Sequence, residues 1–132
     1  MKEVVLYIRT NPNEYIINQL NELEAYCKLN DLTITKKYID NGYSSCDYNR
    51  ASLKYMLYDI SLGKINTILI TELKVIGRDA SKTMYYLNLF RENNIRLISI
   101  KDKFDNKNID DDIYYHFNEI MEALYGNNTN NK

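Results

Sequence analysis

The sequence has few of the residues from which metal sites and disulfide frameworks are built. Its 132 residues include one histidine, two cysteines and no tryptophan. The cysteines, Cys27 and Cys46, have no metal-ligand spacing, and a single histidine does not complete a metal site with them. We therefore expect no metal. We also expect Cys27, on the apolar face of a predicted helix, to be a core residue and not half of a disulfide.

The sequence also has no apolar run of transmembrane length, and its first residues lack the apolar segment of a signal peptide. A hydrophobic content of 45% and a charged content of 27% are typical of one soluble globular domain, which we expect in the cytoplasm and not at a membrane. There is no excess of positive charge, because the net charge is −1. The charge alone therefore argues against a nucleic-acid-binding module, which usually carries surplus Lys and Arg.

The first informative stretch covers residues 6–14, where an apolar run ends and a helical pattern begins. Arg9 stands at the carboxyl end of a predicted strand beside a predicted helix N-terminus, where backbone amides and a guanidinium favour a phosphate. Asn11 suits a helix N-cap, with Pro12 at the first helical position and Glu14 completing a capping box. From these residues alone, capping and anion binding both stay open.

Hydrophobic periodicity predicts strands that alternate with helices along the chain. The predicted strands cover residues 3–9, 32–40, 65–71 and 95–100. The predicted helices cover residues 13–30, 50–62, 80–92 and 109–125. This order indicates an α/β fold of three layers, in which helices cover both faces of a mostly parallel central sheet.

Three polar segments follow the carboxyl ends of predicted strands: Arg9, the loop at 42–50 and the loop at 72–78. Functional groups of parallel sheets gather in the loops beyond these strand ends. The pattern therefore predicts a single site formed by the three segments, without indicating its chemistry.

The last predicted helix carries one apolar stripe, made of Ile109, Ile113, Phe117, Ile120, Met121 and Leu124. This stripe either packs onto the sheet or forms a dimer interface, since an amphipathic face must be buried somewhere. We expect a main domain at 1–106, a long C-terminal helix at 107–126 that serves dimerisation, and a disordered polar tail at 127–132.

Four short stretches carry motifs that can be compared with known families. They read YIRTN at 7–11, DNGYSS at 40–45, RASL at 50–53 and ELKVIGRD at 72–79. Together they resemble the N-terminal catalytic domain of serine site-specific recombinases, the resolvase/invertase family, over roughly residues 3–125. That family has Tyr-x-Arg-x-Ser, Asp-x-Gly-x-Ser-Gly, Arg-Pro-x-Leu and Lys-Leu-Asp-Arg-Leu-x-Arg-Asp at these places. The resemblance implies the resolvase-type fold with a C-terminal oligomerisation helix.

The resemblance implies phosphoryl transfer on DNA without a metal or nucleotide cofactor. In the family, a serine attacks the scissile phosphodiester, arginines bind the phosphate, and dimers assemble into a tetramer that exchanges strands. Arg9, Arg50 and Arg78 fall on the phosphate-binding arginines, and Ser44 falls on the family's second serine. The alternative for Arg50 and Arg78 is surface salt bridging, for instance with acidic residues in the same loops.

Three active-site positions depart from the family pattern, and Ala51 replaces the family's proline, which matters less. The nucleophile position is Asn11, whose amide does not form a phosphoester. Lys74 stands where the family has an aspartate, and Val75 stands where it has the first arginine of an Arg-x-x-Arg pair. Thr10 remains as a less favoured substitute nucleophile, and Ser44 or Ser45 is less favoured again.

We therefore predict a recombinase-like domain, related to site-specific DNA recombination and integration, that has lost strand cleavage. We expect it to act by assembly as a homodimer or higher oligomer, or beside an active recombinase. The family's C-terminal DNA-binding domain is not in the sequence, so DNA contact would be weak or would depend on a missing domain or partner. The alternatives are an active recombinase domain with rearranged chemistry and a protein-interaction module with no DNA role.

Overall fold

The computed structural model describes residues 2–43, 49–77 and 79–108. Within them, five strands form one sheet in the order β2-β1-β3-β4-β5. The strands are β1 (Lys2–Thr10), β2 (Leu32–Asn41), β3 (Thr67–Ile70), β4 (Arg96–Ser99) and β5 (Phe104–Asp105). The first four are parallel, and β5 runs antiparallel to β4. The prediction of an α/β fold with a mostly parallel sheet is confirmed.

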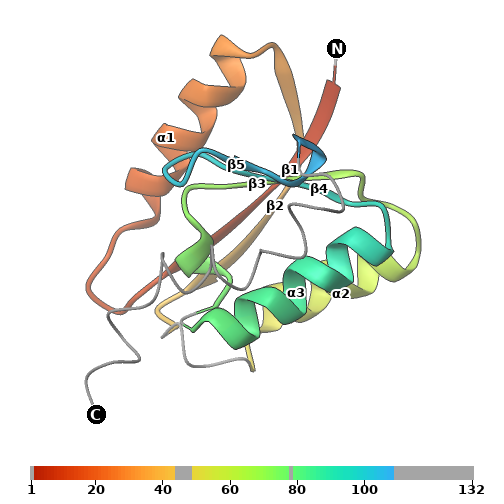
Figure 1. Ribbon diagram of the computed structural model, residues 1–132. Coiled ribbons are helices and arrows are strands. Elements are labelled where there is room, and N and C mark those ends of the chain that lie inside the picture. The colour runs from red at the N-terminus through yellow and green to blue at the C-terminus, as the bar shows by residue number, and fades with distance from the viewer. Residues whose placement is uncertain (1, 44–48, 78, 109–132) are drawn as a thin grey trace.

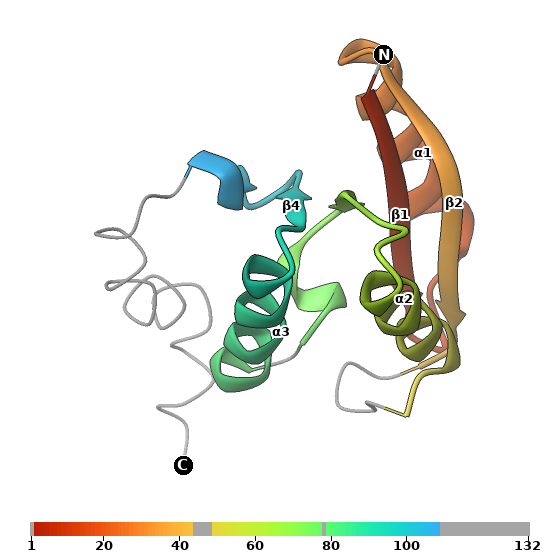
Figure 2. The same ribbon diagram turned by 90° about the vertical axis from the view of Figure 1, so that its right-hand side faces the viewer.

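Three helices cover the two faces of the sheet. They are α1 (Ile16–Leu29), α2 (Ala51–Ser61) and α3 (Ala80–Glu92). Figures 1 and 2 show α1 on one face of the sheet, with α2 and α3 side by side on the other. The three predicted layers are therefore present, because each parallel crossover carries a helix over the sheet.

The central strand β1 is buried on both faces. Its even-numbered side chains, Val4, Leu6 and Ile8, pack with Leu23 and Cys27 beneath α1. The side chain of Cys27 is only 3% exposed, so its predicted place in the core is confirmed.

The odd-numbered side chains of β1 point to the opposite core. Val5 and Tyr7 pack with Met56 of α2 and Phe90 of α3. Side chains alternate along a strand, so Arg9 continues this second row at the carboxyl end of β1. The alternation thus places its guanidinium under the α2 side of the sheet and not under α1.

The predicted start of α1 is wrong. The helix begins at Ile16, with Tyr15 as its N-cap residue and no capping hydrogen bond from that side chain. Instead, the Glu14 amide donates to the Asn11 carbonyl at 3.0 Å, and the Asn11 amide donates to the Glu14 carboxylate at 2.7 Å. The capping-box pair therefore closes a separate turn before the helix, around Pro12.

The other boundaries differ less from the expectations. The helix predicted at 80–92 matches α3, whereas the strands predicted at 65–71 and 95–100 are shortened to β3 and β4. The two-residue β5 was not predicted, because two residues carry no periodicity. The helix predicted at 109–125 and its stripe (Ile113, Phe117, Ile120, Met121 and Leu124) lie outside the described residues.

No helix within the described ranges is both long and apolar enough to cross a membrane.

Candidate functional site

Arg9 forms the centre of the predicted site and is almost enclosed by protein oxygens. Its side chain leaves the residue 5% exposed. Nη1 donates to the Asn11 side-chain oxygen at 2.7 Å and to the Tyr43 carbonyl at 2.9 Å. Nη2 donates to the Lys74 carbonyl at 3.2 Å, and Nε donates to the Val75 carbonyl at 3.3 Å. The guanidinium thus ties the end of β1 to two loops that leave other strands.

Arg50 belongs to the same group and is fully buried, with 0% exposure. Its Nη1 donates to the Val75 carbonyl at 2.8 Å, and its Nη2 donates to the Ile76 carbonyl at 2.9 Å. Both arginines therefore donate to the same Val75 oxygen. The alternative of a surface salt bridge is wrong for Arg50, because the side chain is in the interior.

Tyr7 and Asp40 connect this arginine pair to α2. The Arg50 guanidinium donates to the Tyr7 hydroxyl at 3.1 Å, and that hydroxyl donates to Asp40 at 2.9 Å. The Asp40 carboxylate also accepts the amides of Ser52 and Leu53, both at 2.9 Å. A carboxylate at the end of β2 therefore caps the first turn of α2, where its charge also favours the helix dipole.

Burial shifts the ionisation of both groups that flank Arg50. Loss of solvent lowers the pKa of the Arg9 guanidinium, and the nearby positive charge of Arg50 adds to this effect. Burial raises the pKa of the Tyr7 hydroxyl, although Arg50 opposes the rise. Tyr7 is consequently a neutral hydrogen-bonding link and not a base at neutral pH.

Asn11, which the resemblance aligns with a nucleophile, is an exposed residue whose side-chain oxygen accepts a hydrogen bond from Arg9. This side-chain oxygen occupies one of the hydrogen-bonding positions of the Arg9 guanidinium. The predicted role as a helix cap is wrong, because the side chain contacts Arg9 and the helix begins later.

Thr10 does not face this group. It is fully buried, and its hydroxyl donates to the Asn41 side chain at 2.6 Å and accepts from the Gly42 amide at 3.1 Å. Strand alternation places it on the opposite side of β1 from Arg9. Its hydroxyl is therefore engaged in holding the loop after β2.

The two other substituted positions contribute backbone and not side chains to the arginine pair. Lys74 and Val75 belong to a short 3-10 helix, Leu73–Val75, after β3. Lys74 is exposed, and its carbonyl accepts from Arg9. The Val75 side chain is buried in the core while its carbonyl accepts from both arginines. Residues 74 and 75 therefore hold the two arginines through their backbone oxygens.

Gln19 belongs to this neighbourhood and was missed by the sequence reasoning. Its side-chain amide donates to the Arg9 backbone carbonyl at 2.7 Å. Its side-chain oxygen is buried without a hydrogen-bond partner within the described part of the chain. The sequence does indicate this position, because Gln19 is a polar residue within the apolar stripe of Ile16, Leu20 and Leu23 on α1.

Two predicted site residues, Ser44 and Arg78, lie outside the described residues. The neighbouring Asp79 is the N-cap residue of α3, where its carboxylate accepts the Lys82 amide at 2.8 Å. The structure therefore brings Arg9, Arg50, Asn11 and the backbone of 74–75 together at the carboxyl ends of the strands, as the loop pattern predicts. Over the described ranges, no cluster of three potential metal ligands accompanies them.

Comparison with known families gives one match that spans nearly the whole chain. The family model described as "Resolvase, N terminal domain" matches residues 4–132. A search of curated proteins gives no match.

Solved structures share the fold at low sequence identity. The N-terminal catalytic domain of TP901-1 integrase superposes with a TM-score of 0.79 at 23% identity, covering 98% of each chain. A resolvase family site-specific recombinase from Streptococcus pneumoniae gives a TM-score of 0.75 at 21% identity, covering 99% of this chain and 90% of that one. The C-terminal catalytic domain of ISC1926 TnpA, an IS607-like serine recombinase, gives 0.66 at 19% identity, with 74% and 70% covered.

Proposed function

The chain belongs to the resolvase family, whose N-terminal domain it matches over residues 4–132, and on this premise we propose that it takes part in site-specific DNA recombination without cleaving DNA itself. It is a serine-recombinase-like domain with a non-catalytic role in assembly. We further propose that it acts as a homodimer or higher oligomer, or beside an active recombinase that supplies the nucleophile.

One observation carries the proposal: the side chain at the nucleophile position is an amide bound to Arg9. Asn11 offers no hydroxyl to attack a phosphodiester, and its oxygen accepts from Nη1 of Arg9 at 2.7 Å. The hydroxyl of the adjacent residue, Thr10, is buried and hydrogen-bonded to the Asn41 side chain. These contacts favour a site in which the family's phosphate-binding arginines are kept for structure.

Arg50 supports the same interpretation. A fully buried guanidinium that donates to two backbone carbonyls and to the Tyr7 hydroxyl holds the loop after β3 against α2. Its charge contributes to the potential at the site, but its donors face the protein. Arg50 is therefore kept for the fold and not for contact with a phosphate.

A covalent-trapping assay tests the proposal. The full chain is incubated with a nicked suicide substrate in which strand cleavage by a recombinase would be irreversible. We expect no covalent protein–DNA adduct. An adduct would establish the active recombinase with rearranged chemistry and overturn the proposal.

The Asn11→Ser variant probes the site more directly. We expect little or no cleavage to be recovered, because Lys74 and Val75 still stand in place of the family's aspartate and arginine. The matched control is Asn13→Ser, an exposed position in the same turn. Robust adduct formation by Asn11→Ser alone would mean that only the nucleophile was missing.

A net charge of −1 and the enclosed arginines favour a second candidate, a protein-interaction module with no DNA role. Electrophoretic mobility of a labelled duplex at low salt separates the two candidates. Slower migration with added protein supports the recombination role. Unchanged migration together with a stable dimer in light scattering supports the interaction module.

A further inference from the structure

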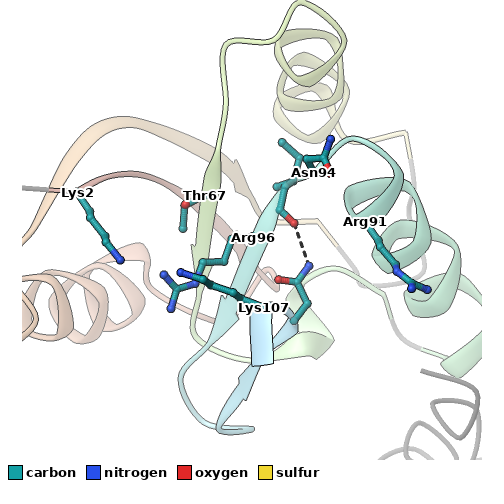
Figure 3. A pocket seen from close by; sticks show the side chains of 8 residues that line it. Lys2, Thr67, Arg91, Asn94, Arg96 and Lys107 are labelled. Carbon is teal, nitrogen blue, oxygen red and sulfur yellow. Dashed lines mark hydrogen bonds between the residues drawn. The ribbon is translucent and has the colours of Figure 1, made fainter. Parts of the chain in front are cut away.

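A polar cleft lies at the amino ends of β1, β3 and β4, whereas Arg9 lies at the carboxyl end of β1. Its volume is about 480 Å³. Residues from three strands, the end of α3 and the segment after β5 line it, and Figure 3 shows it from close by. The cleft is thus formed by rigid elements that are far apart in sequence.

The cleft concentrates positive charge in a chain whose net charge is −1. Its lining includes Lys2, Arg91, Arg96 and Lys107, together with Thr67 and Asn94. Figure 3 shows the side-chain nitrogens of Lys2, Arg96 and Lys107 gathered on one side of the cleft, with Arg91 on the other.

The sheet register explains why these cations meet. Thr67 and Arg96 are paired at the first position of β3 and β4, and Lys2 is the first residue of β1 on the other side of β3. Parallel strands all begin at the same end of the sheet, so the first residues of β1 and β4 line the same cleft. Lys107 is added from the segment after β5.

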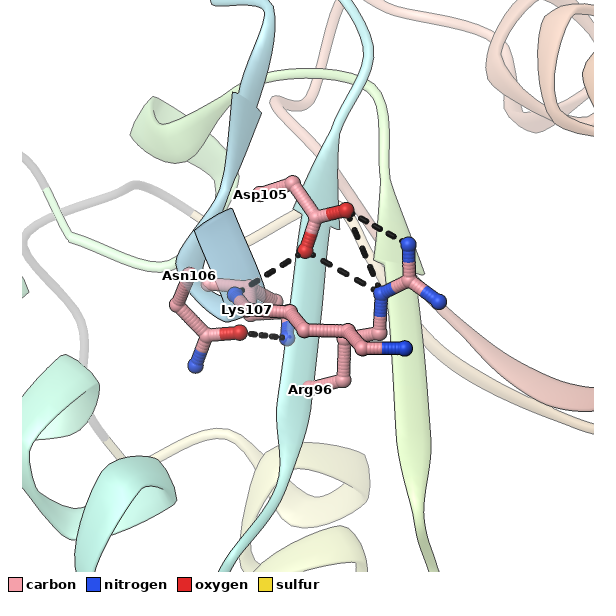
Figure 4. Close-up of polar contacts among 5 residues, drawn as sticks. Arg96, Asp105, Asn106 and Lys107 are labelled. Atoms are coloured by element: carbon pink, nitrogen blue, oxygen red, sulfur yellow. Dashed lines mark hydrogen bonds and ion pairs between the residues drawn. The ribbon is translucent and has the colours of Figure 1, made fainter. Parts of the chain in front are cut away.

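Arg96 is held in a fixed orientation by Asp105. Its Nη2 donates to the carboxylate at 2.6 Å, and its Nε lies 3.1 and 3.2 Å from the two carboxylate oxygens (Figure 4). Its other terminal nitrogen, Nη1, has no partner among the described residues, and the side chain is 28% exposed. One end of the guanidinium is therefore anchored while the other is open to a ligand.

The segment that carries Lys107 is also fixed. The Asn106 side chain accepts the Leu97 amide and donates to the Ile95 carbonyl, both at 2.9 Å. The Lys107 amide donates to Asp105 at 3.1 Å. These contacts attach residues 105–107 to β4 and keep the ammonium group of Lys107 next to Arg96 (Figure 4).

Charge sets the class of ligand. Lys2, Arg96 and Lys107 with Asp105 give a local charge of about +2 at neutral pH. Lys2 and Arg96 also line an adjoining cleft of about 390 Å³, which contains Asp31. The carboxylate of Asp31 reduces the positive charge there, so the charge is strongest in the first cleft, beside Lys107. Ammonium groups and an open guanidinium end suit a tetrahedral oxyanion such as a phosphate.

We propose that this cleft binds a phosphate group, carried either by a DNA backbone or by a free nucleotide. Lys2 and Lys107 act as point charges, and the open end of Arg96 donates hydrogen bonds to the phosphate oxygens. The site lies at the opposite end of the sheet from Arg9 and does not depend on any activity there.

Titration of the full chain with inorganic phosphate, followed by amide NMR, tests the site. At constant ionic strength set by chloride, we expect phosphate to shift the amides of Thr67, Arg96 and Lys107. The double variant Lys2→Gln/Lys107→Gln should weaken phosphate binding about tenfold, because it removes two charge-assisted contacts. Both side chains are exposed, and neither makes a hydrogen bond or ion pair with another described residue.

The matched control is Lys37→Gln/Lys103→Gln, which removes the same charge from exposed positions elsewhere. It should leave phosphate binding unchanged. Equal weakening by both double variants would mean non-specific charge attraction and would overturn the proposal. An absence of shifts at the cleft amides would do so as well.

Competition then identifies the source of the phosphate. A short duplex that displaces phosphate and shifts the same amides indicates a DNA backbone, whereas displacement by a nucleoside monophosphate alone indicates a free nucleotide. Displacement by poly-glutamate but by neither of these would indicate an acidic protein surface and refute the phosphate site. The phosphate titration needs no strand cleavage, so its outcome is separate from that of the proposed function.

Discussion

At the scale of single residues, the contact between Asn11 and Arg9 is the most distinctive feature of the candidate site. An exposed amide oxygen accepts a hydrogen bond from a guanidinium that is otherwise surrounded by carbonyls. None of these acceptors carries a full negative charge. The positive charge of Arg9 is therefore solvated by dipoles, beside a second buried cation, Arg50.

Placing a carboxylate at this position should stabilise the fold. We expect Asn11→Asp to raise the free energy of unfolding by about 1 kcal/mol, because a charge-assisted hydrogen bond replaces a neutral acceptor. Urea denaturation followed by circular dichroism measures the change. The control is Asn13→Asp, which adds the same charge to the same turn. Equal effects of the two variants would mean that the hydrogen bond between Arg9 and residue 11 does not contribute to stability.

A change at Arg50 should destabilise the fold, because buried oxygens of Tyr7, Val75 and Ile76 accept its hydrogen bonds. We expect Arg50→Lys to lower the free energy of unfolding by about 3 kcal/mol, since one ammonium group leaves buried carbonyl or hydroxyl partners unsatisfied. Thermal unfolding is the measurement. Lys54→Gln, an exposed change on the same helix, should stay within about 0.5 kcal/mol of the wild type. A similar small loss in Arg50→Lys would contradict a structural role for the guanidinium.

A polar cluster joins β2 to α2 at the scale of elements. The Asp59 carboxylate accepts the Tyr38 hydroxyl at 2.5 Å and the Lys36 ammonium at 3.0 Å. The Lys36 nitrogen also lies 4.3 Å from the centre of the Tyr55 ring. Burial, with the hydrogen bond to Asp59, raises the pKa of Tyr38 to about 12. The hydroxyl is therefore a donor at all physiological pH values.

This cluster predicts part of the acid sensitivity of the fold. The hydrogen bonds from Tyr38 and Lys36 lower the pKa of the Asp59 carboxyl, although burial opposes them. A carboxyl with a lowered folded-state pKa stabilises the fold above its unfolded pKa of about 4, and this stability is lost as the pH falls through the folded value. We expect Asp59→Asn to be less stable than the wild type at pH 7 and to lose less stability between about pH 5 and pH 2.

Urea denaturation at a series of pH values provides the measurement. Glu3→Gln, which removes an exposed carboxyl, is the control and should keep the acid dependence of the wild type. A pH profile of Asp59→Asn that runs parallel to that of the wild type would show that Asp59 is not the group responsible.

The element boundaries show which features the sequence predicts correctly and why two predictions, the start of α1 and the exposure of Arg50, were wrong. The α/β order, α3 and the convergence of loops at the strand ends follow from periodicity and turn residues. The start of α1 was wrong because Asn11 and Glu14 form the hydrogen bonds of a capping box around a separate turn. Burial of Arg50 was missed because a charged residue in a predicted loop is usually solvated. Its carbonyl partners at 75–76 come from a distant loop that local patterns do not specify.

The whole molecule is organised around β1, which lies between β2 and β3 and is covered by cores on both faces. The edge strand β5 has only two half-buried residues, and the Arg96–Asp105 ion pair joins it to β4. Opening the sheet at β1 therefore exposes both cores, whereas opening at β5 exposes neither completely. Stability should be distributed unevenly across one continuous sheet.

Native-state hydrogen exchange at increasing denaturant tests this distribution. We expect the amides of Leu6 and Tyr7 to exchange only by global unfolding, with the denaturant dependence of the whole domain, and the Asp105 amide to exchange through a smaller opening. Asp105→Asn, which weakens the ion pair with Arg96, should speed exchange at β5 and leave the opening mechanism at β1 unchanged. Equal opening free energies at β1 and β5 in the wild type would mean that the sheet opens as one unit, and that the two cores do not set its order of unfolding.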